Sequence, residues 1–598
     1  MLGWALFVVA AAVQSSGTTT EAFKFDYIRM KDRIEADGRT RRVVEMSVVL
    51  RTPPAVREFG QIAAPYVEGY GEVTFDQIRV QRPSGTTSEI TDARIEDLNP
   101  FGINDAAIPV DVRFKKLTIP RLEPGDRLSY RVTTSQRAFV PGEASGEMRF
   151  TPVPADAPQV YELDIPAVSR LTVNVRADLG ASWEVLPSEK DRLVRRLTLN
   201  VAPPVVASTG LTEAQTEMLQ RPDVSYSTFA SWSMVGHWWW DMSRAQLKGD
   251  EVIAQQAARL TAGKATPREK VEAIAAFVSS SVRYLNVSFG AGRMQPRSAV
   301  SVLSSKYGDC KDKAGLVIAL AEASGVEVRP ALIHSTRVRL QDEAPGPHQF
   351  DHMIAVAILG PSEKDWLWID PTNTLSPATM LAQSLRDKRA LVVDRRGEGR
   401  MFQTPASIPG AARRAVELTG SVDSDGLFKG RVKVTERSDS ESALRASFGG
   451  GAPEQHAEMV KSWLGAPWKN ARFKSVRAAD SVDVEHPFWI EFEFERDVTG
   501  IESEKEWKFW VPDLGPVLFE PSKDSTTAKP VRFDVVESSF RASVDLPEGT
   551  TARAPLSVSL DRRFATLASR YSVEGRTLKS ERVIRFLQPS VEIGRAHV

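Results

Sequence analysis

The sequence has 598 residues, which is too long for one hydrophobic core and predicts about three to four domains. Lys and Arg together number 77, as do Asp and Glu, so the formal net charge is zero and a general nucleic-acid or anionic-membrane binder is not indicated. A single cysteine excludes an intrachain disulfide and any cysteine-rich zinc or iron–sulfur site, and the seven histidines form no HExxH pair. We therefore expect a globular protein with no metal and no cofactor.

The N-terminal stretch is apolar. Leu2 to Val13 form an unbroken run of 12 apolar residues, and small polar residues follow them. The run is too short to span a bilayer but fits the apolar part of a signal peptide, although the usual positive residues before it are absent. We expect a signal peptide over residues 1–20 and an exported, periplasmic or cell-envelope protein, with a buried terminal strand or helix as the alternative. No later segment reaches the roughly 18 apolar residues that a membrane span needs.

Residues 22–205 have a strand-like pattern. Five segments are rich in Val, Thr, Phe and Tyr and alternate in part, and turn-forming residues separate them. The segments are 41–51, 72–82, 127–134, 171–180 and 192–201. Short strands at this spacing predict an antiparallel β-rich domain of the sandwich type. The stretch "NVAPPVVASTG", residues 200–210, is typical of a linker.

From 225 to 400 the period becomes helical. In "TPREKVEAIAAFVSSSVRYL", Thr266 can cap a helix, and Glu269 completes a capping box. A Trp-rich segment places Trp232, Val235, Trp239 and Met242 on one helical face; we favour core packing there over stacking on a carbohydrate ligand. The strands "HMIAVAIL" and "WLWID" follow the helices. The order predicts an α+β domain.

Residues 410–590 return to strand patterning. Asp425-Gly426 and Glu574-Gly575 are turn pairs of two hairpins, and 488–496 alternates strictly. A helical insertion is expected near "PEQHAEMVKSWLG", and residues 592–598 fit no element, so we expect an artefactual tail. The predicted fold class is thus an α+β multidomain protein whose central α+β domain lies between two antiparallel β-rich, sandwich-like domains.

The single cysteine lies in "KYGDCKDKAG". Asp309 is a strong N-cap candidate for a helix that Gly325 closes, so Cys310 takes the first helical position. Unsatisfied N–H groups and the helix dipole favour a thiolate there, and Lys311 and Lys313 add positive charge. A cysteine used for packing would lie further along, on the apolar face. This placement predicts a nucleophile.

A thiolate nucleophile needs a base and a group that orients it. His334 follows the cysteine helix and can simply end a buried strand, and His348 lies in the loop "EAPGPHQF", where a solvated histidine is expected. His352 opens a strand, and Asp370 ends the next one. If these strands pair as a hairpin, Asp370 can fix the tautomer of His352. The alternative for an Asp before Pro371 is a turn residue.

Three motifs, "YGDCKDKAG", "FDHMIAVAI" and "WLWIDPTN", resemble the Cys, His and Asp motifs of the transglutaminase-like superfamily on the papain-like fold, in the same order. More narrowly, "QPRSAVSVLSSKYGDCKDKA" resembles a bacterial two-part family in which a β-rich domain of unknown function precedes a transglutaminase-like domain. The resemblance implies that Cys310 is the nucleophile, His352 the base and Asp370 the orienting acid. For the oxyanion, the backbone N–H of Cys310 needs one side-chain donor, with Gln295 as the candidate and Asn286 as the alternative.

The leading hypothesis is cysteine-dependent acyl transfer through a thioester. Water as acceptor gives a peptidase or amidase, and a lysine-like amine gives a transglutaminase; the sequence leaves both open. The flanking β-rich domains favour a protein or peptide substrate, because strand edges bind extended chains. The alternative is a non-catalytic cell-envelope binding or assembly protein on a transglutaminase-like scaffold.

Overall fold

The computed structural model describes most of the chain in two compact units. The described residues are 22–98, 112–138, 140–151, 158–200, 217, 220–285, 294–407, 412–450, 452–464, 468, 470–497, 501–503, 506–507, 530–532, 537–588 and 590–592. Unit 1 takes residues 1–263, 282–366 and 389–402, and unit 2 takes 264–281, 367–388 and 403–598. The three-domain division expected from the sequence stays a prediction. The expected signal peptide and most of the tail, 593–598, lie outside the described residues, as does most of the expected linker.

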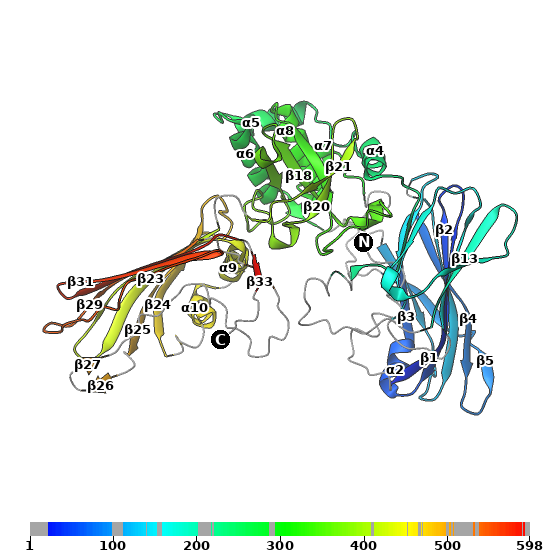
Figure 1. Ribbon diagram of the computed structural model, residues 1–598, viewed down its shortest axis with the longest axis horizontal. Coiled ribbons are helices and arrows are strands. Elements are labelled where there is room, and N and C mark those ends of the chain that lie inside the picture. The colour runs from blue at the N-terminus through cyan, green and yellow to red at the C-terminus, as the bar shows by residue number, and fades with distance from the viewer. Residues whose placement is uncertain are drawn as a thin grey trace. The chain divides into compact units, whose positions relative to one another are not determined.

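Unit 1 begins with an eight-stranded sheet in the order β12-β13-β10-β1-β2-β8-β4-β5 (Figure 1). Its strands are β1 (Phe23–Ile34), β2 (Thr40–Leu50), β4 (Gly71–Gln81), β5 (Thr87–Glu89), β8 (Arg127–Gln136), β10 (Gln159–Pro166), β12 (Trp183–Leu186) and β13 (Arg192–Leu199). Neighbours pair antiparallel except β1 and β10, which run parallel. Four of the five expected strands, 41–51, 72–82, 127–134 and 192–201, therefore lie in this sheet, whereas the expected strand 171–180 is shorter, Thr172–Val175, and lies in a smaller sheet.

Two smaller sheets accompany it. The first has the order β3-β7-β6 and the second β11-β14-β9. Their strands are β3 (Gln61–Val67), β6 (Arg94–Leu98), β7 (Val112–Thr118), β9 (Ser145–Met148), β11 (Thr172–Val175) and β14 (Val224–Ser227), and the short helices are α2 (Pro53–Phe59) and η1 (Ala177–Leu179). One core joins Phe25 and Val48 of the large sheet to Ile62 and Leu117 of the first small sheet. This is the face-to-face packing that the alternating pattern predicts.

The central α+β region contains a sheet in the order β19-β18-β17-β20-β21, and all of these strands lie wholly or mostly in unit 1 except β19, which lies mostly in unit 2 (Figure 1). Its strands are β17 (Val328–Ile333), β18 (His352–Ile358), β19 (Trp366–Ile369), β20 (Arg389–Val393) and β21 (Gly399–Gln403); the other elements are α4 (Trp232–Ser243), α5 (Glu251–Thr261), β15 (Arg283–Tyr284), α7 (Ala299–Ser305), β16 (Tyr307–Gly308), α8 (Cys310–Ala323), η3 (Pro347–Gln349) and η4 (Glu363–Asp365). Helix α8 packs against β17, β18, α5 and α7, so it is buried almost all round.

Helix α4 shows why core packing is the right interpretation of the Trp-rich segment. Val235 and Trp239 are fully buried, and the indole N–H of Trp239 donates to the carbonyl of Met294 at 2.9 Å. A Cβ on Gly236 would lie 2.5 Å from the Cα of Gly399 in β21, so only glycine lets the helix approach this strand. Val235 and Trp239 of the predicted face therefore pack inward, and Trp232 and Met242 at its two ends are half-buried.

Unit 2 holds a second eight-stranded sheet, in the order β24-β25-β23-β22-β29-β32-β31-β30. Its strands are β22 (Arg413–Val422), β23 (Leu427–Arg437), β24 (Arg472–Ala478), β25 (Phe488–Asp497), β29 (Glu537–Asp545), β30 (Val558–Arg562), β31 (Ala565–Glu574) and β32 (Thr577–Phe586), with β22 and β29 parallel. The remaining elements are α6 (Pro267–Ser281), η5 (Gln383–Leu385), α9 (Asp439–Gly450), η6 (Pro453–Gln455), α10 (His456–Leu464), and the short pairs β26 (Ile501–Ser503) with β27 (Glu506–Trp507) and β28 (Pro530–Arg532) with β33 (Ser590–Glu592).

Side chains of α9 and α10, such as Leu444 and Val460, share one core with Val432, Phe492 and Phe540 of the second sheet. In unit 2, helices cover one face of the large sheet, whereas in unit 1 a small sheet covers one face of the large sheet. Both predicted turn pairs occur at hairpin tips, where Gly426 and Gly575 have φ of 80° and 61°. The predicted α+β multidomain fold class is confirmed.

Candidate active site

Cys310 is the first residue of α8, as predicted from its capping signal. The Asp309 side chain accepts a hydrogen bond from the backbone N–H of Asp312 at 3.2 Å, which fixes the helix start. At the other end Gly325 has φ of 76°, and the N–H of Val326 donates to the carbonyl of Ala321, which closes the helix. Cys310 is partly buried beside the N–H groups of the first turn, a position that favours a negatively charged group.

The lysines beside Cys310 do not simply add positive charge. The Lys311 ammonium forms an ion pair with Asp309, and both side chains are largely buried. Lys313, also buried, donates from Nζ to the carbonyl of Val282 at 2.7 Å. Burial raises the pKa of Asp309, and the charge of Lys311 opposes that rise. The helix N-terminus is therefore a better source of positive potential for the thiol than Lys311, whose charge Asp309 offsets.

A second ion pair holds the chain that approaches the helix. The Arg297 backbone N–H and Nε donate to the two carboxylate oxygens of Asp312 at 2.8 and 2.9 Å. The guanidinium of Arg297 also lies over the ring of Tyr307, 4.4 Å from its centroid. These contacts tie the segment before α7 to the first turn of α8.

His352 is the first residue of β18 and pairs in register with Ile333 of β17. The backbone N–H of Asp351 donates to the carbonyl of Ile333 at 3.2 Å, and the Asp351 carboxylate accepts from the N–H and Oγ of Ser335 at 2.7 and 2.8 Å. His334, which follows β17, lies with Nδ1 3.3 Å from the same carboxylate. The backbone that carries His352 is thus held on both sides.

Asp370 directly follows β19, the neighbour of β18 in the sheet. Its side chain is buried, its backbone N–H donates to the carbonyl of Ala378 at 2.7 Å, and its Oδ1 accepts from the N–H and Oγ1 of Thr372 at 3.0 and 2.7 Å. The turn role considered as the alternative is therefore real. The role of Asp370 in orienting His352 stays a prediction.

Gln295 lies in the segment before α7 and is held there through its side chain. Its Nε2 donates to the carbonyl of Met242 at 2.6 Å, so one of the two amide hydrogens serves the scaffold. Its role as oxyanion donor stays a prediction, and that role would use the second amide hydrogen. Asn286, the alternative donor, lies outside the described residues.

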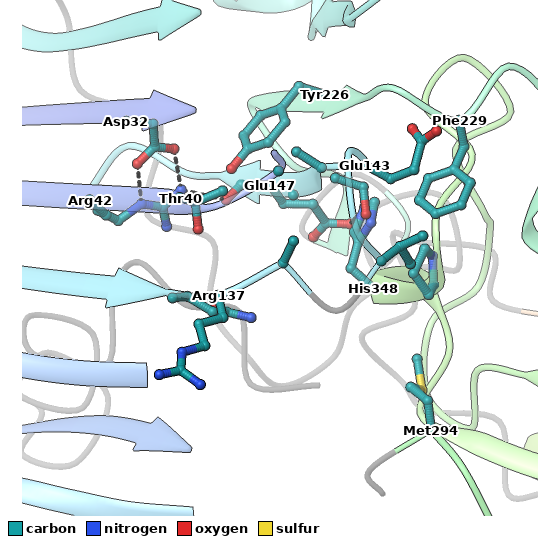
Figure 2. Close-up of a pocket in the computed structure, with 18 of the residues that line it drawn as sticks. Asp32, Thr40, Arg42, Arg137, Glu143, Glu147, Tyr226, Phe229, Met294 and His348 are labelled. Atoms are coloured by element: carbon teal, nitrogen blue, oxygen red, sulfur yellow. Dashed lines mark hydrogen bonds and ion pairs between the residues drawn. The ribbon is translucent and has the colours of Figure 1, made fainter. Parts of the chain in front are cut away.

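His348 differs from its sequence-based expectation. The expectation of a solvated histidine is wrong, because both ring nitrogens are buried and neither has a hydrogen-bond partner among the described residues. Burial lowers the pKa of His348 to about 4, with Glu147 opposing and Arg337 adding to this change. The ring lines a cavity of about 150 Å³ in unit 1 (Figure 2). The walls come from segments far apart in the sequence, so no local signal could have predicted it.

Within the described residues, no group of three or more His, Cys, Asp or Glu side chains is placed to hold a metal ion. None of the helices in the described part of the chain combines the length and the apolar character needed to cross a membrane.

Comparisons with known proteins agree with this architecture. Residues 36–204 match the model of a domain of unknown function with a solved structure, DUF3857, and residues 254–371 match that of the transglutaminase-like superfamily. No curated protein matches the chain. Over 96% of this chain and 94% of the other, the fold is similar to a "putative protease" from Parabacteroides distasonis ATCC 8503, with 12% identity and a TM-score of 0.61.

Two further structures share shorter stretches. A "putative cysteine protease" from Cytophaga hutchinsonii is 12% identical over 58% of this chain and 78% of the other, with a TM-score of 0.17. An M1 zinc metallopeptidase from Deinococcus radiodurans is 11% identical over 34% of this chain and 42% of the other, with a TM-score of 0.19. Neither score is high enough to bear on the fold. The chain thus contains a region that matches DUF3857, followed by a region that matches the transglutaminase-like superfamily. The full-length similarity to the Parabacteroides distasonis structure shows a shared fold.

Proposed function

We propose that the protein is a cysteine-dependent acyl-transfer enzyme that acts on amide bonds of a protein or peptide. The observation that carries the proposal is the position of Cys310 at the capped N-terminus of α8, a helix that packs against β18, the strand that begins at His352. A thiol at a helix start, together with a histidine held by a sheet backbone, is what nucleophilic catalysis by cysteine requires.

In the proposed reaction the Cys310 sulfur attacks the amide carbonyl and His352 takes the thiol proton. The tetrahedral oxyanion is stabilised by the backbone N–H of Cys310 and by Gln295. The C–N bond then breaks, the amine leaves with the proton from His352, and a thioester remains on Cys310. Water or an amine attacks the thioester, His352 accepts its proton, and the thiolate is released. Asp370 holds the imidazole in the required tautomer.

The acceptor separates the two forms of this proposal. Water gives a peptidase or amidase, and an amine gives a transglutaminase. We also propose export to the periplasm or cell envelope, on the apolar run after the N-terminus. The similar structure from Parabacteroides distasonis, described as a "putative protease", supports the hydrolytic form only by analogy of fold.

The rate of Cys310 alkylation by iodoacetamide, measured from pH 5 to 10, tests the proposal. A thiolate activated by histidine reacts well below pH 8, and we expect His352→Ala to slow the reaction at pH 7 by about tenfold or more. His237→Ala is the matched control, because His237 is an exposed histidine on α4, and it should leave the profile unchanged.

Identical pH profiles in the wild type and His352→Ala would contradict the catalytic assignment and favour the non-catalytic binding protein. If the profiles differ as expected, mass spectrometry of the acyl group trapped on Cys310 from a cell-envelope extract identifies the substrate. A free acid product then distinguishes hydrolysis from transfer to an amine.

A further inference from the structure

The cavity lined by His348 is built on the face of the first large sheet. Its floor contains Thr40 and Arg42 of β2, which pair in register with Gln136 and Thr134 of β8. Strand β9, through Gly146 and Glu147, and strand β14, through Tyr226, form one wall (Figure 2). The loop after β17 and helix η3 form another, and α4 reaches the cavity through Trp238.

A buried ion pair holds the walls together. Arg337, in the loop after β17, donates from both terminal nitrogens to the two carboxylate oxygens of Glu147 at 2.6 and 2.9 Å. Both side chains are about 90% buried, with exposed fractions of 12% and 11%. A Cβ on Gly346 would lie 2.6 Å from Nδ1 of His348 and 2.8 Å from the Cβ of Ser145, so glycine permits this close approach. The cavity is therefore a packed feature of unit 1.

The acidic groups of the lining already have partners. Asp32 accepts two hydrogen bonds from Arg42, both at 2.6 Å, and a third from the hydroxyl of Tyr161 at 2.8 Å. Glu143 accepts a hydrogen bond from the hydroxyl of Thr228, and Glu147 accepts hydrogen bonds from Arg337. A ligand therefore finds no uncommitted carboxylate in this cavity.

The basic groups of the lining keep free hydrogen-bonding capacity. Nη1 of Arg42 is buried and has no hydrogen-bond partner in the part of the chain that the structure describes. The side chain of Arg137 is exposed, and its guanidinium has no ion-pair partner among the same residues. His348 adds two buried, unpartnered ring nitrogens. Buried polar groups are almost always hydrogen-bonded in folded proteins, so unmatched groups around one cavity indicate a missing partner.

Apolar side chains occupy the opposite part of the lining. Phe229 is buried, and its ring lies 6.3 Å from that of Trp238 in an edge-to-face arrangement. Met294 completes this part of the wall. A ligand that fits must therefore combine an apolar body with an anionic group, and its remaining polar atoms must suit a neutral imidazole, which has one donor and one acceptor.

We propose that the cavity binds the C-terminal residue of a peptide with an apolar side chain. Its carboxylate is held by the guanidinium groups of Arg42 and Arg137, its amide N–H donates to the ring of His348, and its side chain packs against Phe229 and Trp238. Carboxylate recognition by arginine is strong because the donors are charged and match the carboxylate geometry. The proposal requires no reaction at Cys310, so it stands or falls separately from the proposed function.

The test is a saturation-transfer NMR titration of the full chain carrying Cys310→Ala, which removes any reaction with the thiol. The probes are N-acetyl-L-phenylalanine, its carboxamide, and 3-phenylpropanoate, which keeps the carboxylate and loses the amide. We expect N-acetyl-L-phenylalanine to bind with a dissociation constant of about 1 mM or tighter. The carboxamide should bind at least about tenfold more weakly, and 3-phenylpropanoate several-fold more weakly.

Arg137→Gln is the informative variant, because Arg137 is exposed and its replacement does not threaten folding. It should weaken binding of N-acetyl-L-phenylalanine by about tenfold. Arg79→Gln is the control, because Arg79 is exposed on β4 and does not line the cavity, and it should leave binding unchanged. The proposal is overturned if acid and amide bind equally, if the two variants behave alike, or if none of the probes binds. If 3-phenylpropanoate binds as tightly as N-acetyl-L-phenylalanine, the amide is not recognised. The proposed peptide ligand is then wrong, and the cavity binds a simple carboxylate.

Discussion

Two histidines, His348 and His352, lie four residues apart in the sequence and differ in almost every physical respect. His352 is the first residue of a central strand, paired with Ile333, and only partly buried. His348 lies in a short helical turn with both ring nitrogens buried and unpartnered among the described residues, 3.6 Å from the carboxylate of Glu147. The first is positioned by a local backbone element, and the second by contacts from distant parts of the chain.

The difference separates two kinds of site. The proposed catalytic groups are each placed by the end of a helix or strand, where sequence patterns are informative. The cavity is made where the face of a sheet meets a loop, and the ion pair between its walls joins Glu147 and Arg337, which are 190 positions apart in the sequence. The first site should therefore tolerate changes in the cavity wall, and the cavity should tolerate loss of the thiol.

The largest effect is expected at the ion pair that joins the cavity walls. Glu147→Gln leaves the largely buried guanidinium of Arg337 without its countercharge, which should destabilise unit 1 by about 3 kcal/mol. Chemical unfolding followed by Trp fluorescence measures the loss. Faster tryptic cleavage after Arg337 should accompany it, because the loop is released.

Glu68→Gln is the matched control in the same unit. Glu68 pairs with Arg113 at 3.1 Å on the surface, where its side chain is 60% exposed, so the change should cost less than about 0.5 kcal/mol. Equal losses from the two variants would show that the Glu147 pair does not hold the walls.

The sequence predicts the proposed catalytic elements well because their signals are local. Asp309 caps α8 and Gly325 closes it, and Thr266 and Glu269 form the expected capping box, with the Glu269 carboxylate accepting from the N–H of Thr266 at 2.8 Å. Strict alternation in 488–496 likewise becomes the alternating burial of β25. Each of these signals depends on residues within a few positions of one another.

The cavity could not be predicted in the same way. Arg42, Glu147 and Arg337 are ordinary surface residues by sequence pattern, and only tertiary contacts bury them. His348 follows Gly346 and Pro347, which predict an exposed loop, yet the missing side chain of Gly346 is what lets the loop approach Ser145. The sequence predicts that Lys311 adds free positive charge beside Cys310, but its charge is paired with Asp309, and this pairing depends on burial.

The next effect is a pH dependence of stability that arises from His348. Its folded pKa of about 4 lies below the ordinary 6.5, so the unfolded chain binds more protons between these values and stability falls as the pH falls through this window. The expected loss between pH 8 and pH 5 is about 2 kcal/mol. Unfolding of the wild type and of His348→Gln at several pH values measures it.

The comparison with His348→Gln removes the contributions that both proteins share. The charged neighbours of the ring are Glu147 on β9 and Arg337 in the loop. Burial alone would raise the pKa of Glu147, but Arg337 and His348 lower it below its ordinary value of 4.5. The ionised Glu147 therefore stabilises the fold, and this contribution is lost only as the pH falls below 4.5. The window from pH 6.5 to 4.5 therefore reports His348, and an equal slope in both proteins would contradict its burial as a neutral group.

The smallest effect concerns the charge beside Cys310. Asp309→Asn keeps an oxygen that caps α8 but removes the negative charge that offsets Lys311, so the ammonium should favour the thiolate. We expect alkylation of Cys310 at pH 7 to be about threefold faster. Glu322→Gln is the control, because it removes a carboxylate from the far end of the same helix and should leave the rate unchanged. A slower reaction of Asp309→Asn would mean that the paired carboxylate positions the thiol, and the reactivity of Cys310 would then depend on the ion pair as well as on the helix N-terminus.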